Sequence, residues 1–188
     1  MTKHIYDFSQ LDFSRVCVIG SAGSGKTTFS KKIGNLIGIT PTHLDKILLG
    51  ENWTDLTHEQ HVQILEPIVD EPTWLIDGMW SKTLDMRYKN ATLVLFLDYK
   101  PAVCAWRAMT RSLKHMGKQR DDLAPGCKDK LDLKFYKYIL GFRKGCRLKV
   151  LQAMQDHPNV PIIAFTKPKQ AQEFLAQLQE HLNNKQNG

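Results

Sequence analysis

The chain has 188 residues, of which 42% are hydrophobic, and these values are typical of one globular domain with a buried core. They exclude a disordered chain, and no apolar run approaches the roughly 20 residues that a membrane-spanning helix needs. The N-terminus lacks the apolar stretch of a secretory signal peptide. The 4 cysteines are widely spaced without a metal-binding pattern, so we expect a reduced protein of the cytoplasm.

The formal net charge is +7, and the basic residues are concentrated between Arg107 and Lys149. A basic field of this kind attracts polyanions, which include nucleotide phosphates and nucleic acids. A solvated basic face without any partner gives the same pattern. The charge therefore favours an anionic ligand without identifying it.

Apolar, β-branched runs alternate with helical patterns along the chain, which predicts an α/β fold with a parallel sheet. The first strand is expected at Arg15–Gly20, where a continuous apolar run indicates burial on both faces. Further strands are expected at residues 39–44, 73–77, 92–98 and 160–165.

Helices are expected where apolar residues recur at helical spacing. Residues Lys26–Ile37 carry such a stripe, and Gly38 stops it. Thr57 and Gln60 have the spacing of a capping box at the start of the next helix, which is expected to end before Pro72.

The second half of the chain is expected to hold three more helices and one long polar connection. One helix has Pro101 in its first turn, another extends to about Gln155, and an amphipathic helix closes the chain. The basic segment at 112–132 is too long for a plain connector, so a functional lid is expected there. Residues 1–14 precede the first strand and receive no role. Residues 1–188 are expected to form a single domain, because no internal boundary or repeat is visible.

The segment at 20–27, Gly-Ser-Ala-Gly-Ser-Gly-Lys-Thr, matches the P-loop pattern. Its glycines let backbone N–H groups converge on one anion, and the following helix directs its positive dipole end to the same point. Lys26 is then predicted to reach the β- and γ-phosphates of ATP, and the Thr27 hydroxyl to bind Mg²⁺. The predicted nucleotide-binding residues are Gly20, Ser21, Ala22, Gly23, Ser24, Gly25, Lys26, Thr27 and Thr28.

Three aspartates follow predicted strands, at the sheet edge where parallel α/β folds bind their ligands. Asp45 is a candidate for orienting an acceptor or removing its proton, and a turn or cap residue is the alternative. Asp77 is a candidate for holding Mg²⁺ through water, with a turn residue as the alternative. Asp98 is either an acid of the metal site or the cap of the next helix.

Arg107 and Arg111 lie four residues apart and so share one face of the helix that precedes the predicted lid. Their guanidinium groups are candidates for neutralising charge on a transferred phosphoryl group, with a solvated face as the alternative. The predicted catalytic set is Lys26, Asp45, Arg107 and Arg111, and Arg107 also counts as a nucleotide ligand. Weaker candidates for the same work are Arg120, Arg143 and Arg147. A further interpretation is an acceptor pocket lined by Trp53, Trp80 and Trp106. It ranks second, because tryptophans are more often part of the core.

The order of these motifs resembles that of the nucleoside monophosphate kinase group, which includes adenylate, shikimate and gluconate kinases. More narrowly, the chain is similar to bacterial proteins known as DNA topology modulation or flagellar-regulation proteins. The matching stretches are 43–45 (His-Leu-Asp), 74–78 (Trp-Leu-Ile-Asp-Gly), 81–85 with Arg87, and 124–132.

This resemblance implies a three-layer P-loop fold, with a five-stranded parallel sheet of order 2-3-1-4-5, helices on both faces and a helical lid over ATP. It implies that Arg107 and Arg111 lie near the γ-phosphate and that Asp77 organises the waters of Mg²⁺. The chain departs from these kinases where they bind the acceptor. Residues 79–82 replace the aromatic-Pro-Arg of adenylate kinases, and 43–45 replace the Asp-x-Asp of shikimate kinases, so the acceptor does not follow by transfer.

Two functions are consistent with these patterns. The first is an ATP-dependent kinase that transfers the γ-phosphoryl group to a small-molecule or nucleotide acceptor. The alternative is a nucleotide-dependent regulatory ATPase that binds DNA through its basic C-terminal half, with salt-sensitive contacts to phosphates because no reader module is recognisable. A bare ATPase that switches a protein partner is a third possibility. Guanine-recognition signals are absent, which argues against a GTPase.

Overall fold

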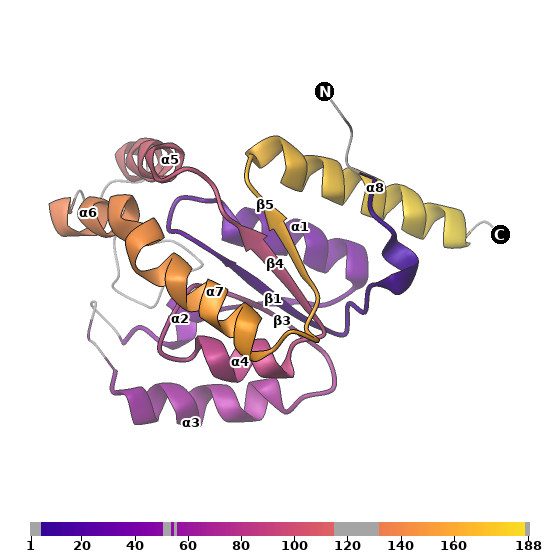
Figure 1. Cartoon of the computed structure of the whole chain (residues 1–188), viewed down its shortest axis with the longest axis horizontal. Helices are drawn as coiled ribbons and strands as arrows, with labels where there is room; N and C mark the ends of the chain where they lie inside the picture. The colour runs from indigo at the N-terminus through magenta and orange to yellow at the C-terminus, as the bar shows by residue number, and fades with distance from the viewer. Residues whose placement is uncertain (1–4, 51–53, 55, 115–131, 187–188) are drawn as a thin grey trace.

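The computed structural model describes residues 5–50, 54, 56–114 and 132–186. Its centre is a five-stranded parallel sheet with helices on both faces (Figure 1). The strand order β2-β3-β1-β4-β5 is the order that the resemblance implied, so the predicted fold class is confirmed. The strands are β1 (Arg15–Gly20), β2 (Pro41–His43), β3 (Trp74–Asp77), β4 (Leu93–Leu97) and β5 (Ile162–Phe165).

The helices that the sequence predicted most firmly have the predicted ends. The first ends at Gly38, whose N–H bonds the carbonyl of Gly34, and Thr57 and Gln60 form the predicted capping box. The described helices are α1 (Lys26–Ile37), α2 (Leu44–Ile47), α3 (His58–Val69), α4 (Leu84–Asn90), α5 (Pro101–Lys114), α6 (Leu133–Gly141), α7 (Cys146–Asp156) and α8 (Pro168–Gln186), with short 3-10 turns η1 (Phe8–Gln10) and η3 (Phe142–Lys144). None of them is long and apolar enough to cross a bilayer.

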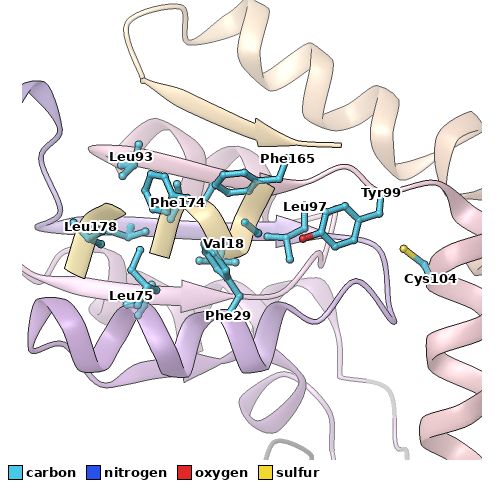
Figure 2. Close-up of a cluster of buried hydrophobic side chains, with 14 of the residues drawn as sticks. Val18, Phe29, Leu75, Leu93, Leu97, Tyr99, Cys104, Phe165, Phe174 and Leu178 are labelled. Atoms are coloured by element: carbon cyan, nitrogen blue, oxygen red, sulfur yellow. The ribbon is translucent and has the colours of Figure 1, made fainter. Parts of the chain in front are cut away.

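Two apolar layers hold the sheet between its helices. On one face, Val18 and Leu93 pack against Phe29 of α1 and Phe174 of α8 (Figure 2). On the other face, alternate residues of the same strands, such as Cys17 and Ile76, pack against α3, α4 and α7. The strands therefore bury both faces, as their continuous apolar sequence predicted.

The segment that precedes β1 belongs to the core. Phe8 is 7% exposed, and its ring lies 5.3 Å from that of Phe174 on α8. Tyr6 packs edge-on against Phe174 at a centroid distance of 5.0 Å. The described part of residues 1–14 thus covers α8, a structural role that the sequence did not suggest.

The structure corrects several predicted boundaries. The second strand is shorter than 39–44, because Leu44 turns into α2, and β5 begins at Ile162 rather than at 160. Pro161 has no N–H to donate to a ladder, although its carbonyl accepts from Val94 at 2.9 Å. The single helix predicted to extend to Gln155 is wrong, since the turn at Phe142–Lys144, next to Gly145, divides it into α6 and α7.

The predicted lid falls mostly outside the described residues. At its start, residues 112–114 continue α5, and at its end Asp132 caps α6 by accepting from the N–H of Lys134 at 2.8 Å. Arg120 and Trp53 also lie outside the described residues. The lid stays a prediction.

Candidate active site

The P-loop joins the end of β1 to the start of α1. The Lys26 amine donates to the carbonyl oxygens of Gly20 and Ser21, each at 3.0 Å, so the side chain folds back over the loop. Gly23 and Gly25 have positive φ angles of 78° and 92°, which side-chain-bearing residues rarely adopt. The first N–H groups of a helix have no intrahelical acceptor, and those of α1 begin at Lys26. This is the geometry of an anion-binding nest.

Helix α5 lies directly against the P-loop. A Cβ atom on Gly23 would be 2.1 Å from the carbonyl oxygen of Cys104, so only glycine fits at this contact. One turn further along α5, Arg107 Nη1 donates to the carbonyl oxygen of Ser24 at 3.3 Å. The structure therefore places Arg107 against the P-loop.

Several charged groups act on the Lys26 amine. Its pKa is lowered, chiefly because burial removes water from the ammonium group, and the carboxylates of Asp45 and Asp77 partly offset this. The positive charge of Arg111 lowers the pKa further. The charges of Asp45, Asp77 and Arg111 therefore all act on the Lys26 amine.

Asp77 lies at the end of β3, 4% exposed, where it pairs with His43 at the end of β2. His43 Nδ1 donates to Asp77 Oδ2 at 2.7 Å, because an ionised carboxylate can only accept. Asp77 Oδ1 is the carboxylate oxygen that His43 does not bond. Sequence reasoning assigned His43 no role; only its place in the 43–45 motif marked it.

Asp45 follows β2 on α2 and is exposed. Its Oδ1 accepts a hydrogen bond from Trp80 Nε1 at 2.7 Å. The indole also contacts the ring of His61 edge-on, with centroids 4.8 Å apart. Trp80 therefore lies beside a predicted site residue, and the acceptor pocket stays a prediction. Trp106, by contrast, is 63% exposed on α5.

Asp98 pairs with an arginine of α7, and its role at the metal site stays a prediction. Both oxygens of its carboxylate accept from Arg147 Nε of α7, at 3.0 and 2.9 Å, and the aspartate is 5% exposed. The pair joins the end of β4 to α7 instead of capping α5. Arg147, a weaker candidate for phosphate binding, is thereby committed to Asp98, and Arg143 is exposed in η3.

The side chains around the loop suit a triphosphate and its magnesium ion. Lys26, Arg107 and the backbone N–H groups of the loop are donors for phosphate oxygens. The Thr27 hydroxyl and Asp77 Oδ1 are oxygen ligands of the kind that Mg²⁺ prefers, directly or through water. The described residues therefore fit the predicted cofactors, ATP and Mg²⁺.

Comparison with solved structures finds the same fold in two kinases. A deoxyadenosine kinase from M. mycoides with bound dATP is 12% identical, with a TM-score of 0.50 over 92% of this chain and 99% of that one. A shikimate kinase from Bacteroides thetaiotaomicron is 18% identical, with a TM-score of 0.50 over 90% and 98% of the two chains. The chain thus has the P-loop kinase fold along nearly its whole length.

No protein-family model and no curated protein sequence matches the chain. The narrower resemblance to DNA topology modulation proteins has no support from these comparisons, and neither has the nucleic-acid alternative.

Proposed function

We propose that this protein is an ATP-dependent kinase that transfers the γ-phosphoryl group to a small-molecule or nucleotide acceptor. The observation that carries the proposal is the set of charges around Lys26. Two cations, Lys26 and Arg107, contact the P-loop, and the carboxylates of Asp45 on α2 and Asp77 at the end of β3 act on the Lys26 amine. Cations suffice to bind phosphate, and a carboxylate at the metal is also used by enzymes that hydrolyse ATP, whereas transfer to an acceptor needs a further group that orients the acceptor.

Each residue has a proposed role in this reaction. Lys26 and Arg107 bind phosphate oxygens and stabilise the charge that develops on them, with Arg111 as the further cation of the same helix face. Thr27 would bind the metal and Asp77 would hold its waters, while the hydrogen bond from His43 fixes the orientation of the Asp77 carboxylate. When bound, MgATP supplies the phosphoryl group and neutralises part of its charge.

The acceptor is proposed to bind beside Asp45 and Trp80. Asp45 is exposed, and the hydrogen bond from the Trp80 indole holds its carboxylate in one orientation. A carboxylate fixed in this way can accept a hydrogen bond from an acceptor hydroxyl and orient it or take its proton. The two kinases of the same fold support this reaction class, although their low identity does not transfer their acceptors.

The proposal is tested by measuring ADP release from MgATP across a panel of nucleoside monophosphates, nucleosides, sugar acids and hydroxy acids. Lys26→Met should abolish stimulation by the productive acceptor. Lys32→Met is the matched control, because Lys32 is an exposed lysine of the same helix. A panel in which no compound raises turnover, together with ATP binding that Lys26→Met leaves unchanged, would contradict the proposal.

A further inference from the structure

Arg87 of α4 is a fully buried cation that the proposed chemistry does not use. It is 0% exposed, and no carboxylate among the described residues lies within ion-pair distance of it. Its guanidinium donates instead to three consecutive carbonyl oxygens: Nη1 to Gly78 at 3.2 Å, and Nη2 to Met79 at 2.9 Å and Trp80 at 3.2 Å. Nη1 also contacts Cys17 Sγ at 3.6 Å.

Such a cation is costly to bury, since a guanidinium loses its hydration. Burial lowers the pKa of Arg87, and the nearby Cys17 and Asp77 offset this only in part. Hydrogen bonds from the charged guanidinium to carbonyl oxygens compensate for the lost hydration only where several carbonyl oxygens lie close together. The planar fork of arginine matches several acceptors at fixed angles, which the single ammonium of lysine cannot do. The arrangement is therefore a clamp on residues 78–80.

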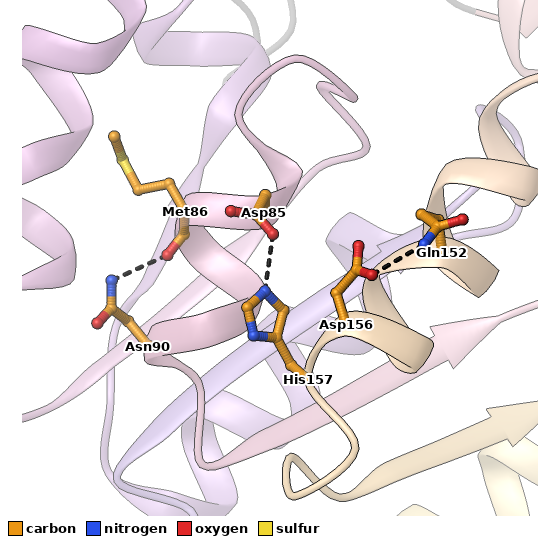
Figure 3. A network of polar contacts seen from close by, with 6 residues as sticks. All are labelled: Asp85, Met86, Asn90, Gln152, Asp156 and His157. Carbon is orange, nitrogen blue, oxygen red and sulfur yellow. Dashed lines mark hydrogen bonds and ion pairs between the residues drawn. The ribbon is translucent and has the colours of Figure 1, made fainter.

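Contacts with α7 hold in place helix α4, which carries Arg87. At the start of α4, Asp85 Oδ1 accepts from His157 Nε2 at 2.7 Å, which ties α4 to the end of α7 (Figure 3). Lys149 of α7 donates to Ser81 Oγ at 3.2 Å, just beyond the clamped residues. Arg87 thus acts from a fixed helix.

Residues 78–80 connect two parts of the candidate site. They follow Asp77 at the end of β3, and they end at Trp80, whose indole donates to Asp45. Trp80 has a φ angle of 22°, the only positive value at a non-glycine residue that the structure describes. A residue in this sparsely populated region keeps its conformation only where its surroundings enforce it, and the Arg87 bond to the Trp80 carbonyl does so.

We propose that Arg87 is a positioning residue: by clamping residues 78–80 it sets the Trp80 indole against Asp45. The effect on an acceptor rests on the proposed function, whereas the effect on Trp80 does not. Loss of the clamp should release the indole from Asp45 and raise the KM for the acceptor, while the affinity for ATP at the P-loop stays unchanged.

The experiment follows the indole N–H signals of the full chain by ¹⁵N–¹H NMR. The chain has 4 tryptophans, so few indole signals are expected, and Trp80→Phe identifies the signal of Trp80. Asp45→Asn should move that signal in the parent protein, because it weakens the acceptor of the indole N–H. In the Arg87→Lys variant, the indole signal of Trp80 should have a different chemical shift from that in the parent protein. Adding Asp45→Asn to this variant should then leave the chemical shift unchanged. Lys89→Met, an exposed cation of the same helix, should leave both the signal and its response intact.

Arg87→Met removes the charge as well, and it provides a second variant that keeps the volume of the side chain roughly constant. If either variant folds and its Trp80 signal still responds fully to Asp45→Asn, the proposal is overturned. Once an acceptor is known, the variants should raise its KM by about tenfold or more at constant ATP affinity, since small displacements of a bound substrate are costly. A purely structural role would leave the response to Asp45→Asn in place, and failure to find an acceptor would not affect the NMR result.

Discussion

The contact between Gly23 and α5 makes a sharp prediction for the substitution Gly23→Ala. The P-loop meets the helix that carries Arg107 at this position. The added Cβ would lie 2.1 Å from the carbonyl oxygen of Cys104 and 3.1 Å from the Cβ of Ala108. Neither neighbour is the end of a flexible side chain, so the loop or the helix must move.

The magnitude follows from two separate costs. A side chain at a φ angle of 78° costs about 1–2 kcal/mol, the usual penalty for an L-residue in the left-handed region. Forcing packed backbone apart adds about 1–3 kcal/mol. The free energy of unfolding should therefore fall by about 2–5 kcal/mol.

Gly38→Ala separates these two costs. Gly38 has a similar φ angle of 74°, and a Cβ atom there meets nothing within 4 Å. Urea unfolding at 25 °C should thus show a loss of about 1–2 kcal/mol for Gly38→Ala and a larger loss for Gly23→Ala. Equal losses in the two variants would refute the close contact between α5 and the P-loop.

Three further substitutions test other parts of the molecule. Phe8→Ala should lower the free energy of unfolding by about 3 kcal/mol, because Phe8 is buried against α8; a loss below about 1 kcal/mol would mean that the N-terminal segment is not part of the core. Arg147→Met should destabilise the protein by about 1–3 kcal/mol in urea, because it leaves the Asp98 carboxylate buried without its partner; an unchanged unfolding midpoint would contradict the pairing. Arg107→Met should slow acceptor-stimulated turnover by about 10²-fold with an unchanged unfolding free energy, and normal turnover would exclude Arg107 from the transfer step.

The features that the sequence predicted well depend on residues close together in the chain. The P-loop, both ends of α1 and the capping box of Thr57 and Gln60 each rest on local geometry, and all agree with the structure. The first helix even has its predicted bounds, because Gly25 and Gly38 provide the left-handed residues at its two ends.

The features that were missed depend on contacts across the chain. The bond between His43 and Asp77 requires the register of β2 against β3, which no local pattern encodes. The same holds for the pair of Asp98 and Arg147, 49 residues apart. The sequence marks Arg87 only as part of a motif, because a charged residue is normally expected at the surface.

The division of α6 from α7 was missed for a different reason. Phe142 in η3 is 2% exposed and apolar residues recur on both sides of the turn, so helical periodicity alone gives no signal to stop. Gly145, with φ −126° and ψ −93°, leaves the helical conformation and redirects the chain. A glycine inside an apolar pattern was thus the better guide to the helix boundary.

The central claim, that the P-loop and its surrounding charges transfer a phosphoryl group, is tested most directly by following the γ-phosphate of ATP. The protein would be incubated with γ-labelled MgATP and the acceptor that best stimulates ADP release, and the label would be located in the products. The account predicts label on the acceptor with the parent protein and none with Lys26→Met. Label found only in inorganic phosphate, at the same rate with and without the acceptor, would contradict it.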